Sequence, residues 1–316
     1  MHMTFSVSPP DTNLSAPIDL SLVRRLFAQP QRVAESLFLR REIAARMHER
    51  LALINLTPRH VLDAGCGEGA DIFTLQDRFS GAQVLGLDGS PGMLALARQR
   101  MAASQPLVSK LLTRWLPIVN QAARAGDADL IAGDFAALPF GPNTLDMIWS
   151  NLALPWHPQP DKVFAEWRRV MRVNGLVMFS CFGPDTLKQL NAAFAEIDLA
   201  PHVLPFVDMH DLGDMLVNAG FSTPVMDMET ITVTYGAPEK LLAEVRALGG
   251  NPLHTRRRGL LGRGAHARLI EHLWSQRDAG GRIPLTYEVV FGHAFRPLPK
   301  TTDSGEAIIR FEPKKR

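Results

Sequence analysis

A glycine-rich turn constrains the fold of this 316-residue chain more than any other segment. Residues 61–64 form a strand-like run, and glycine then occupies every second position, at Gly65, Gly67 and Gly69. Glycine has no Cβ, so the backbone can turn sharply there and lie close to a ligand. A helical pattern follows over residues 70–79, and a helix that begins at such a turn directs free N–H groups toward the same space. The segment predicts a strand–turn–helix unit with a ligand site at the turn.

Two carboxylates separate this turn from a generic nucleotide-binding loop. Asp63 stands two residues before the first glycine, and Asp88 ends the next apolar run, residues 83–88. A carboxylate at such a strand end suits a ribose, because its two oxygens can accept both hydroxyl groups. Together these features resemble the first two motifs of class I S-adenosylmethionine (SAM)-dependent methyltransferases. The alternative is a structural turn that binds no ligand.

The resemblance extends to a third motif and implies SAM as the cofactor. In this family the glycine turn passes under the methionine part of SAM, and the second acid holds the ribose. Asp134 and Phe135 follow a strand predicted at residues 128–132, where the family binds the adenine amino group and a ring nitrogen. Met93 would flank the adenine, or it packs in the core as methionines often do. The implied cofactor-binding residues are Asp63, Gly65, Gly67, Asp88, Gly89, Met93, Asp134, Phe135 and Asn151.

The order of the apolar segments predicts an α/β fold. Five strands alternate with helices, and two more strands follow, separated by a helical excursion at residues 237–280. This pattern predicts a doubly wound, seven-stranded, mostly parallel sheet, whose last strand is antiparallel according to the resemblance. Asn174 and Gly175 are predicted to end the helix that precedes the fifth strand, at residues 176–182.

The segments around the sheet are predicted to belong to a single methyltransferase domain at residues 18–296. Residues 18–54 show a helical pattern that Pro30 splits, and in the family such a segment forms a lid over the cofactor. The remaining predictions are an inserted helix at 105–126, a flexible tail at 1–17 and a C-terminal tail at 297–316.

Charge and cysteine usage argue against several kinds of function. The net charge is only +2, so the whole-molecule field predicts neither a nucleic-acid nor a membrane partner. No stretch has the length and apolarity of a membrane span, and residues 1–17 lack the apolar core of a signal peptide, so a cytoplasmic protein is expected. Cys66 and Cys181 do not suggest a disulfide framework, and no metal site is expected.

The loop at residues 151–157 is the predicted meeting point of methyl donor and acceptor. It follows a nearly continuous apolar strand at 144–150, and in open parallel sheets ligands bind beyond the carboxyl ends of the strands. Trp156 is a candidate wall of the pocket. His157 is a candidate base or a ligand for an acidic acceptor, unless it is merely a surface histidine.

Three further stretches narrow the resemblance to one family. Residues 150–156, 182–187 and 286–294 are similar to segments of the malonyl-acyl-carrier-protein O-methyltransferase of biotin synthesis. That resemblance implies esterification of the free carboxylate of a malonyl thioester, with acyl carrier protein as the partner. Other acceptors stay open, as does a protein arginine hydroxylase and assembly factor of the same fold. The family usually has a tyrosine in its N-terminal helical segment, whereas this chain has only Tyr235 and Tyr287.

The most basic stretch of the chain lies at residues 249–264. A carboxylate acceptor needs a cation to select and orient it, and an arginine can bind a carboxylate through two parallel hydrogen bonds. Arg256 is therefore a candidate catalytic residue, and its neighbours could meet an acidic carrier protein. A solvated basic loop and a nucleic-acid patch are the alternatives.

Overall fold

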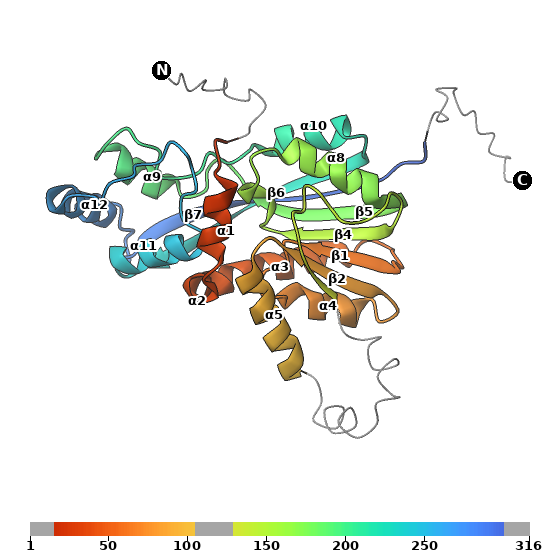
Figure 1. Cartoon of the computed structure of the whole chain (residues 1–316). Helices are drawn as coiled ribbons and strands as arrows, with labels where there is room; N and C mark the ends of the chain where they lie inside the picture. Colours follow the sequence, from red (N-terminus) through yellow and green to blue (C-terminus); the bar gives the residue numbers. More distant parts are fainter. Residues whose placement is uncertain (1–15, 105–128, 300–316) are drawn as a thin grey trace, which may run out of the picture.

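The computed structural model describes residues 16–104 and 129–299, which build one seven-stranded sheet (Figure 1). The strand order is β3-β2-β1-β4-β5-β7-β6. Neighbours pair in parallel except β7, which runs antiparallel to both β5 and β6. The predicted doubly wound, mostly parallel sheet is confirmed. The strands are β1 (His60–Ala64), β2 (Gln83–Asp88), β3 (Asp129–Ala132), β4 (Leu145–Asn151), β5 (Met171–Phe182), β6 (Ser222–Tyr235) and β7 (Ile283–Phe295).

Helices cover both faces of this sheet (Figure 1). Helices α8 (Pro160–Val170) and α10 (Met209–Asn218) lie on one face, and α3 (Leu37–Leu51) and α4 (Ala70–Arg78) lie on the other. A further group of helices lies at the end of the sheet formed by β7 and β6 and belongs to the same apolar cluster as α3 and α4 (Figure 1). The remaining helices are α1 (Leu20–Phe27), α2 (Pro30–Val33), α5 (Pro91–Ser104), α9 (Lys188–Ala195), α11 (Pro238–Ala247) and α12 (Arg263–Ser275), with short 3-10 turns at Ala34–Ser36 and Leu154–Trp156.

Two large apolar clusters form most of the core, one on each face of the sheet, and a small third one joins Ala16 and Ile18 to Leu204 and Leu253. Successive side chains of a strand point to opposite faces, so Met147 and Trp149 of β4 join one cluster while Ile148 joins the other. All three are fully buried. This explains why β4 is apolar along most of its length.

The predicted split of the N-terminal helical segment at Pro30 is confirmed, with Pro30 at the first position of α2 between the longer helices α1 and α3. The flexible tail predicted for residues 1–17 wrongly includes its last two residues, which pack against the domain. Ala16 is buried, and the carbonyl of Pro17 accepts a hydrogen bond from His254 N. The helix predicted at 105–126 lies outside the described residues.

The predicted helix end at Asn174 and Gly175 is wrong. Strand β5 already begins at Met171, directly after α8, and Asn174 lies inside it with a φ of 64°. The pairing of β4 with β5 shifts register between Leu145 and Met147. The two residues therefore belong to a bulge in the strand, where extra residues on one strand allow a left-handed conformation.

None of the helices in the described ranges is long and apolar enough to cross a bilayer. The cytoplasmic location stays a prediction.

Candidate functional site

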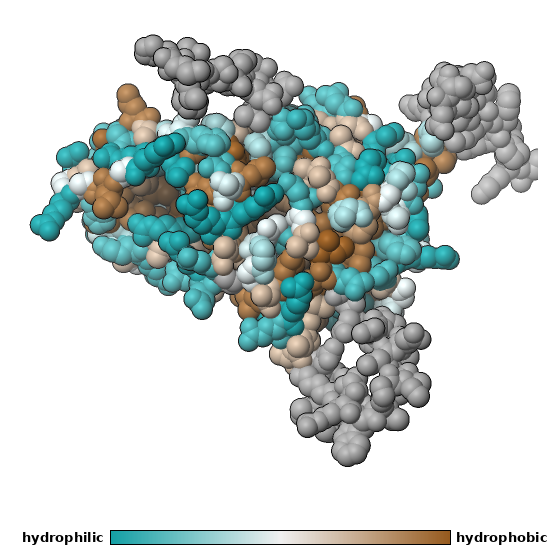
Figure 2. All heavy atoms as spheres, viewed as in Figure 1, coloured by the Kyte–Doolittle hydropathy of each residue, from teal (hydrophilic) through white to brown (hydrophobic). Residues whose placement is uncertain are grey.

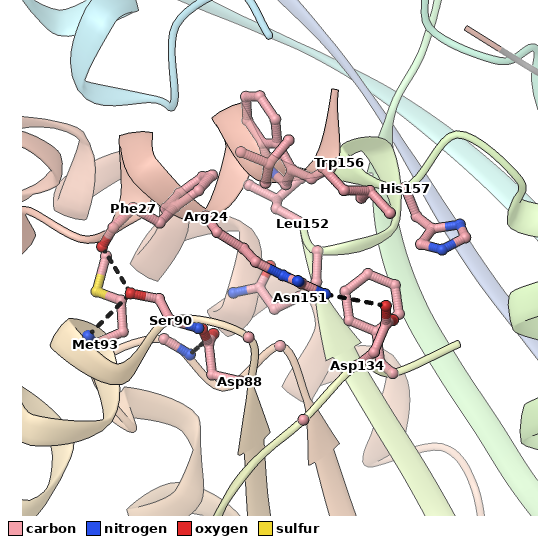
Figure 3. A pocket seen from close by; sticks show the side chains of 18 of the residues that line it. Arg24, Phe27, Asp88, Ser90, Met93, Asp134, Asn151, Leu152, Trp156 and His157 are labelled. Carbon is pink, nitrogen blue, oxygen red and sulfur yellow. Dashed lines mark hydrogen bonds and ion pairs between the residues drawn. The ribbon is translucent and has the colours of Figure 1, made fainter. Parts of the chain in front are cut away.

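A cavity of about 930 Å³ opens at the carboxyl ends of β1, β2 and β4, beneath helix α1 (Figure 3). Eight of the predicted cofactor-binding residues line it, whereas Asp63 does not. Trp156 and His157 line it as well. Its lining also includes residues that the sequence had not singled out, namely Leu20, Val23, Arg24, Phe27, Arg40, Ser90, Leu152, Phe182 and Leu248.

The glycine turn forms the floor of this cavity in a conformation that favours glycine. Gly65, Gly67 and Gly69 have φ values of 83°, 52° and 74°, in the left-handed region. A Cβ on Gly65 would also lie 2.3 Å from Ala153 Cβ. Gly65 N donates a hydrogen bond of 2.7 Å to the carbonyl of Leu87 on β2. The turn is thus fixed between β2 and the loop after β4, with no room for a side chain at Gly65.

Asp88 connects the turn to the start of helix α5. Its Oδ2 accepts from Gly67 N at 2.9 Å, and its Oδ1 accepts from Ser90 N at 2.7 Å. Burial raises the pKa of Asp88, although the two backbone hydrogen bonds act in the opposite direction. Each carboxylate oxygen can accept more than one hydrogen bond, so Asp88 can still bind two hydroxyl groups in the cavity.

Asp63 lies under the turn, in a smaller cavity of about 400 Å³. This cavity shares Arg40, Gly65, Gly67 and Asn151 with the larger one. The Asp63 side chain is only 2% exposed, and no donor within residues 16–104 and 129–299 bonds to its carboxylate. Burial, together with the charges of Asp71, Asp88 and Glu68, raises the pKa of Asp63 well above its usual range. Burial among other carboxylates therefore favours the neutral form of the Asp63 side chain in this structure.

An ion-pair cluster beside the turn was missed by the sequence analysis. Glu68 is buried, with Arg40 Nη1 at 3.2 Å and Arg100 Nη1 at 3.4 Å from its two oxygens. The cluster ties the turn to α3 and α5. Arg40 also donates to the carbonyl of Val33, and its own carbonyl accepts from Asn151 Nδ2 at 3.1 Å. Nothing in the sequence distinguishes Arg40 from the exposed arginines around it.

Helix α1 covers the cavity and is held at its C-terminal end. Ser90 Oγ donates to the carbonyl of Phe27 at 3.0 Å (Figure 3). The Phe27 ring meets Trp156 edge to face, with centroids 5.2 Å apart. Gly249 packs against both rings, and a Cβ there would lie 2.4 Å from Trp156 Cη2. Phe27 is thus the aromatic residue that the N-terminal segment supplies to the site, in a segment without tyrosine.

Asp134 and Met93 line opposite sides of the cavity (Figure 3). Asp134 Oδ1 accepts from Ala136 N at 2.9 Å, and its Oδ2 lies 3.5 Å from Arg24 Nη2, which reaches across the cavity (Figure 3). Met93 is 1% exposed, so it lines the cavity and packs in the core at once.

His157 stands on the Asp134 side of the cavity, with its ring 5.7 Å from that of Phe135. Its Nδ1 accepts from Gln159 N at 3.1 Å. Burial lowers the pKa of His157, so the ring is neutral at pH 7. A neutral histidine does not supply the cation that an acidic acceptor needs.

A second cavity of about 740 Å³ adjoins the first and shares Trp156, Phe182 and Leu248 with it. Most of its lining is apolar and comes from α9, α11 and the loop at residues 202–206, with His202 and Arg246 among its polar residues. Arg256 lines neither cavity. Its guanidinium instead donates to the carbonyl of Leu253 at 2.9 Å, a position that does not support the predicted catalytic role.

Comparison with known proteins agrees with this arrangement. Residues 62–179 match the family described as methyltransferase domain. A solved structure, the YcgJ protein from Bacillus subtilis, superposes with a TM-score of 0.51 and 13% identity, covering 77% of this chain and 94% of that chain. A structure from Bacillus halodurans C-125 with a provisional methyltransferase name gives 0.53 and 15%, covering 81% and 99%. These two likenesses concern the fold alone.

Two relatives from bacteria are much closer in sequence. The protein of Laribacter hongkongensis is 46% identical over 279 residues, which are 87% of this chain and 89% of that protein. The protein of Gallionella capsiferriformans is 42% identical over 298 residues, or 93% and 96%. Both are named malonyl-acyl-carrier-protein O-methyltransferase. The sequence identity along nearly the whole chain, on a methyltransferase fold, shows that this chain belongs to the malonyl-acyl-carrier-protein O-methyltransferase family.

Proposed function

We propose that this methyltransferase uses SAM to esterify the free carboxylate of a malonyl group carried on acyl carrier protein. The names of its relatives support this acceptor. The observation that carries the proposal is the junction of the two cavities at Trp156 and Phe182. A cofactor in the first cavity and a thioester arm in the second would meet there.

The first cavity, together with the smaller one under the glycine turn, suits SAM through its acids and its apolar walls. Asp63 has no donor within the described ranges, and it would accept hydrogen bonds from the amino group of the methionine part. Asp88 would accept from the ribose hydroxyls and Asp134 from the adenine amino group, with Gly65, Gly67, Gly89 and Asn151 completing the contact surface. Met93 and Phe135 would enclose the adenine between apolar surfaces.

The acceptor chemistry needs little from the protein beyond alignment. SAM supplies an electrophilic methyl group on a sulfonium. A carboxylate is ionised at neutral pH, so it attacks without a general base. The contribution of the chain is to hold the reacting atoms in line and to exclude water, which the packing of Phe27 on Trp156 favours. His157, neutral and buried, then serves as a wall of the cavity.

The test is methyl transfer from labelled SAM to malonyl carrier protein. We expect label on the acyl group and a mass gain of one methylene on the carrier. Acetyl carrier protein is the matched control acceptor, because it has the same arm and no free carboxylate. Absence of label on the malonyl group, while an active relative works in the same buffer, would contradict the proposed acceptor.

A further inference from the structure

The second cavity offers the acceptor a path that is separate from the cofactor cavity. Apolar side chains such as Leu190, Phe194 and Leu242 line it, and Arg246 and Asn251 are among its few polar residues. Figure 2 shows a hollow over α9, α11 and α12, with hydrophobic residues inside and hydrophilic residues around much of its rim. The path suits a long, flexible arm with a reactive end.

Two loops are fastened together beside this cavity. Arg257 Nη1 lies 2.7 Å from Asp198 Oδ2, and Asn251 Nδ2 donates to the carbonyl of Pro201 at 2.8 Å. His202, which lines the cavity, bonds to Asp198 Oδ1 at 2.8 Å. Hydrogen bonds from His202 and Arg257 lower the pKa of Asp198 to about 2, so the carboxylate stays charged at physiological pH. The arginine loop is thereby held next to the cavity and not free in solvent.

The basic charge of the chain is concentrated here. Residues 246–268 contain six arginines and no acidic residue, and without these arginines the acidic residues of the chain would outnumber its basic ones. Within residues 16–104 and 129–299, Arg246 and Arg258 have no ion-pair partner, and both are exposed. Positive charge that no carboxylate of these described ranges neutralises is available to an acidic partner.

Exposed leucines accompany the arginines. Leu199 follows Asp198 directly, and the carbonyl of Leu260 accepts from Arg257 Nη2. The two side chains are 102% and 95% exposed, more than any other large hydrophobic residue described. A nucleic-acid partner does not account for these exposed leucines, because proteins bind nucleic acids mainly through contacts with the phosphates. A thioester arm without a carrier protein does not account for them either. Exposed apolar side chains next to exposed arginines fit a folded, acidic protein.

We propose that Leu199, Arg246, Arg257, Arg258 and Leu260 form the docking surface for an acidic carrier domain, whose thioester arm reaches the methyl donor through the second cavity. The inference rests on the proposed function and adds to it where the carrier docks and by which route its arm enters. The arm would pass Arg246 and Leu248 and end at Trp156, where the two cavities join.

The test compares two acceptors on the same variants. One is malonyl carrier protein, and the other is a malonyl thioester of pantetheine without the protein. We expect R258E and the pair L199D/L260D to lower kcat/KM for the carrier-bound acceptor about tenfold more than for the small thioester. Rising salt should lower kcat/KM for the carrier-bound acceptor more in the wild type than in R258E, because salt screens the attraction that R258E has already lost. The matched controls are R98E and L53D, an exposed arginine on α5 and an exposed leucine after α3.

Equal losses on both acceptors, or losses no larger than those of R98E and L53D, would overturn the docking surface. Thermal melting of each variant shows that it is folded. Direct measurement of carrier-protein binding to the immobilised chain tests the docking surface independently of methyl transfer. If the wild type methylates neither acceptor, the proposed function fails, and the binding of R258E and L199D/L260D relative to the controls still decides where the carrier docks.

Discussion

The two cavities differ in how the chain builds them. The first cavity takes both of its lining carboxylates, Asp88 and Asp134, and its glycine turn from three short segments, residues 63–69, 88–93 and 134–135, each at the end of a parallel strand. The second cavity combines the end of β5, helices α9 and α11, and the loops at 202–206 and 248–251. The lining of the first cavity comes mainly from short local motifs, whereas the second cavity forms where segments far apart in the sequence pack together. A change in the first should therefore affect SAM binding, whereas a change in the second should affect the acceptor.

The largest effect is expected from D88A. Asp88 holds Gly67 N and Ser90 N, and its loss leaves both donors and the ribose hydroxyls without an acceptor. We expect SAM affinity to fall roughly a thousandfold, which corresponds to about 4 kcal/mol. Calorimetric titration with SAM measures it, and D77A, at an exposed acid on α4, is the control. A loss no greater than that of D77A would place the ribose elsewhere.

Next comes W156A, at the junction. Trp156 lines both cavities and packs against Phe27, so its removal should loosen the alignment of donor and acceptor. We expect kcat/KM for the malonyl acceptor to fall about a hundredfold while SAM affinity changes much less. F38A, at a partly exposed phenylalanine of α3, controls for loss of a ring. If SAM affinity and turnover fall by similar factors, the two cavities do not have separate roles in binding donor and acceptor.

The D63N variant tests separately how Asp63 affects the stability of the fold and how it affects SAM binding. Burial raises the pKa of Asp63, so its charged form destabilises the fold, and this cost appears as pH rises above the pKa of the unfolded chain. Without SAM, D63N should therefore melt at a higher temperature than the wild type, and the difference should be larger at pH 7 than at pH 4. SAM affinity should fall about tenfold, because one charge-assisted hydrogen bond is lost. Thermal melting with and without SAM measures both, with D77N as the control. If D63N instead melts at a lower temperature than the wild type at pH 7 without SAM, a partner within the chain already balances the charge of Asp63.

The smallest effect is expected from R24A. The Arg24 side chain is 57% exposed and its ion pair with Asp134 spans 3.5 Å, so solvent screens the pair. We expect SAM affinity to change by a few-fold at most, and less at high salt. The control is R25A, the neighbouring exposed arginine of α1. A change as large as that of D63N would show that α1 contributes to the cofactor half as strongly as the strand ends do.

The sheet and the strand-end residues of the first cavity could be predicted from the sequence. Gly65, Gly67, Asp88 and Asp134 are recognisable because their functions depend on local backbone geometry at strand ends, and the spacing of a short motif preserves that geometry. Alternation of side chains also made β4 recognisable as a strand buried on both faces. The bulge at Asn174 was not predictable, since the same residues end helices as readily as they interrupt strands.

Which arginines lie near the site could not be predicted from the sequence. Arg40 and Arg256 look alike in the sequence, yet Arg40 pairs with buried Glu68 at the cavity and Arg256 lines neither cavity. Likewise, Phe27 and Trp156 meet across a long sequence separation because α1 is held over the strand ends by Ser90 and packs on Gly249. Local spacing fixes backbone geometry within a segment. The position of a long side chain depends on which distant segments pack against it, and that is settled only when the chain is folded.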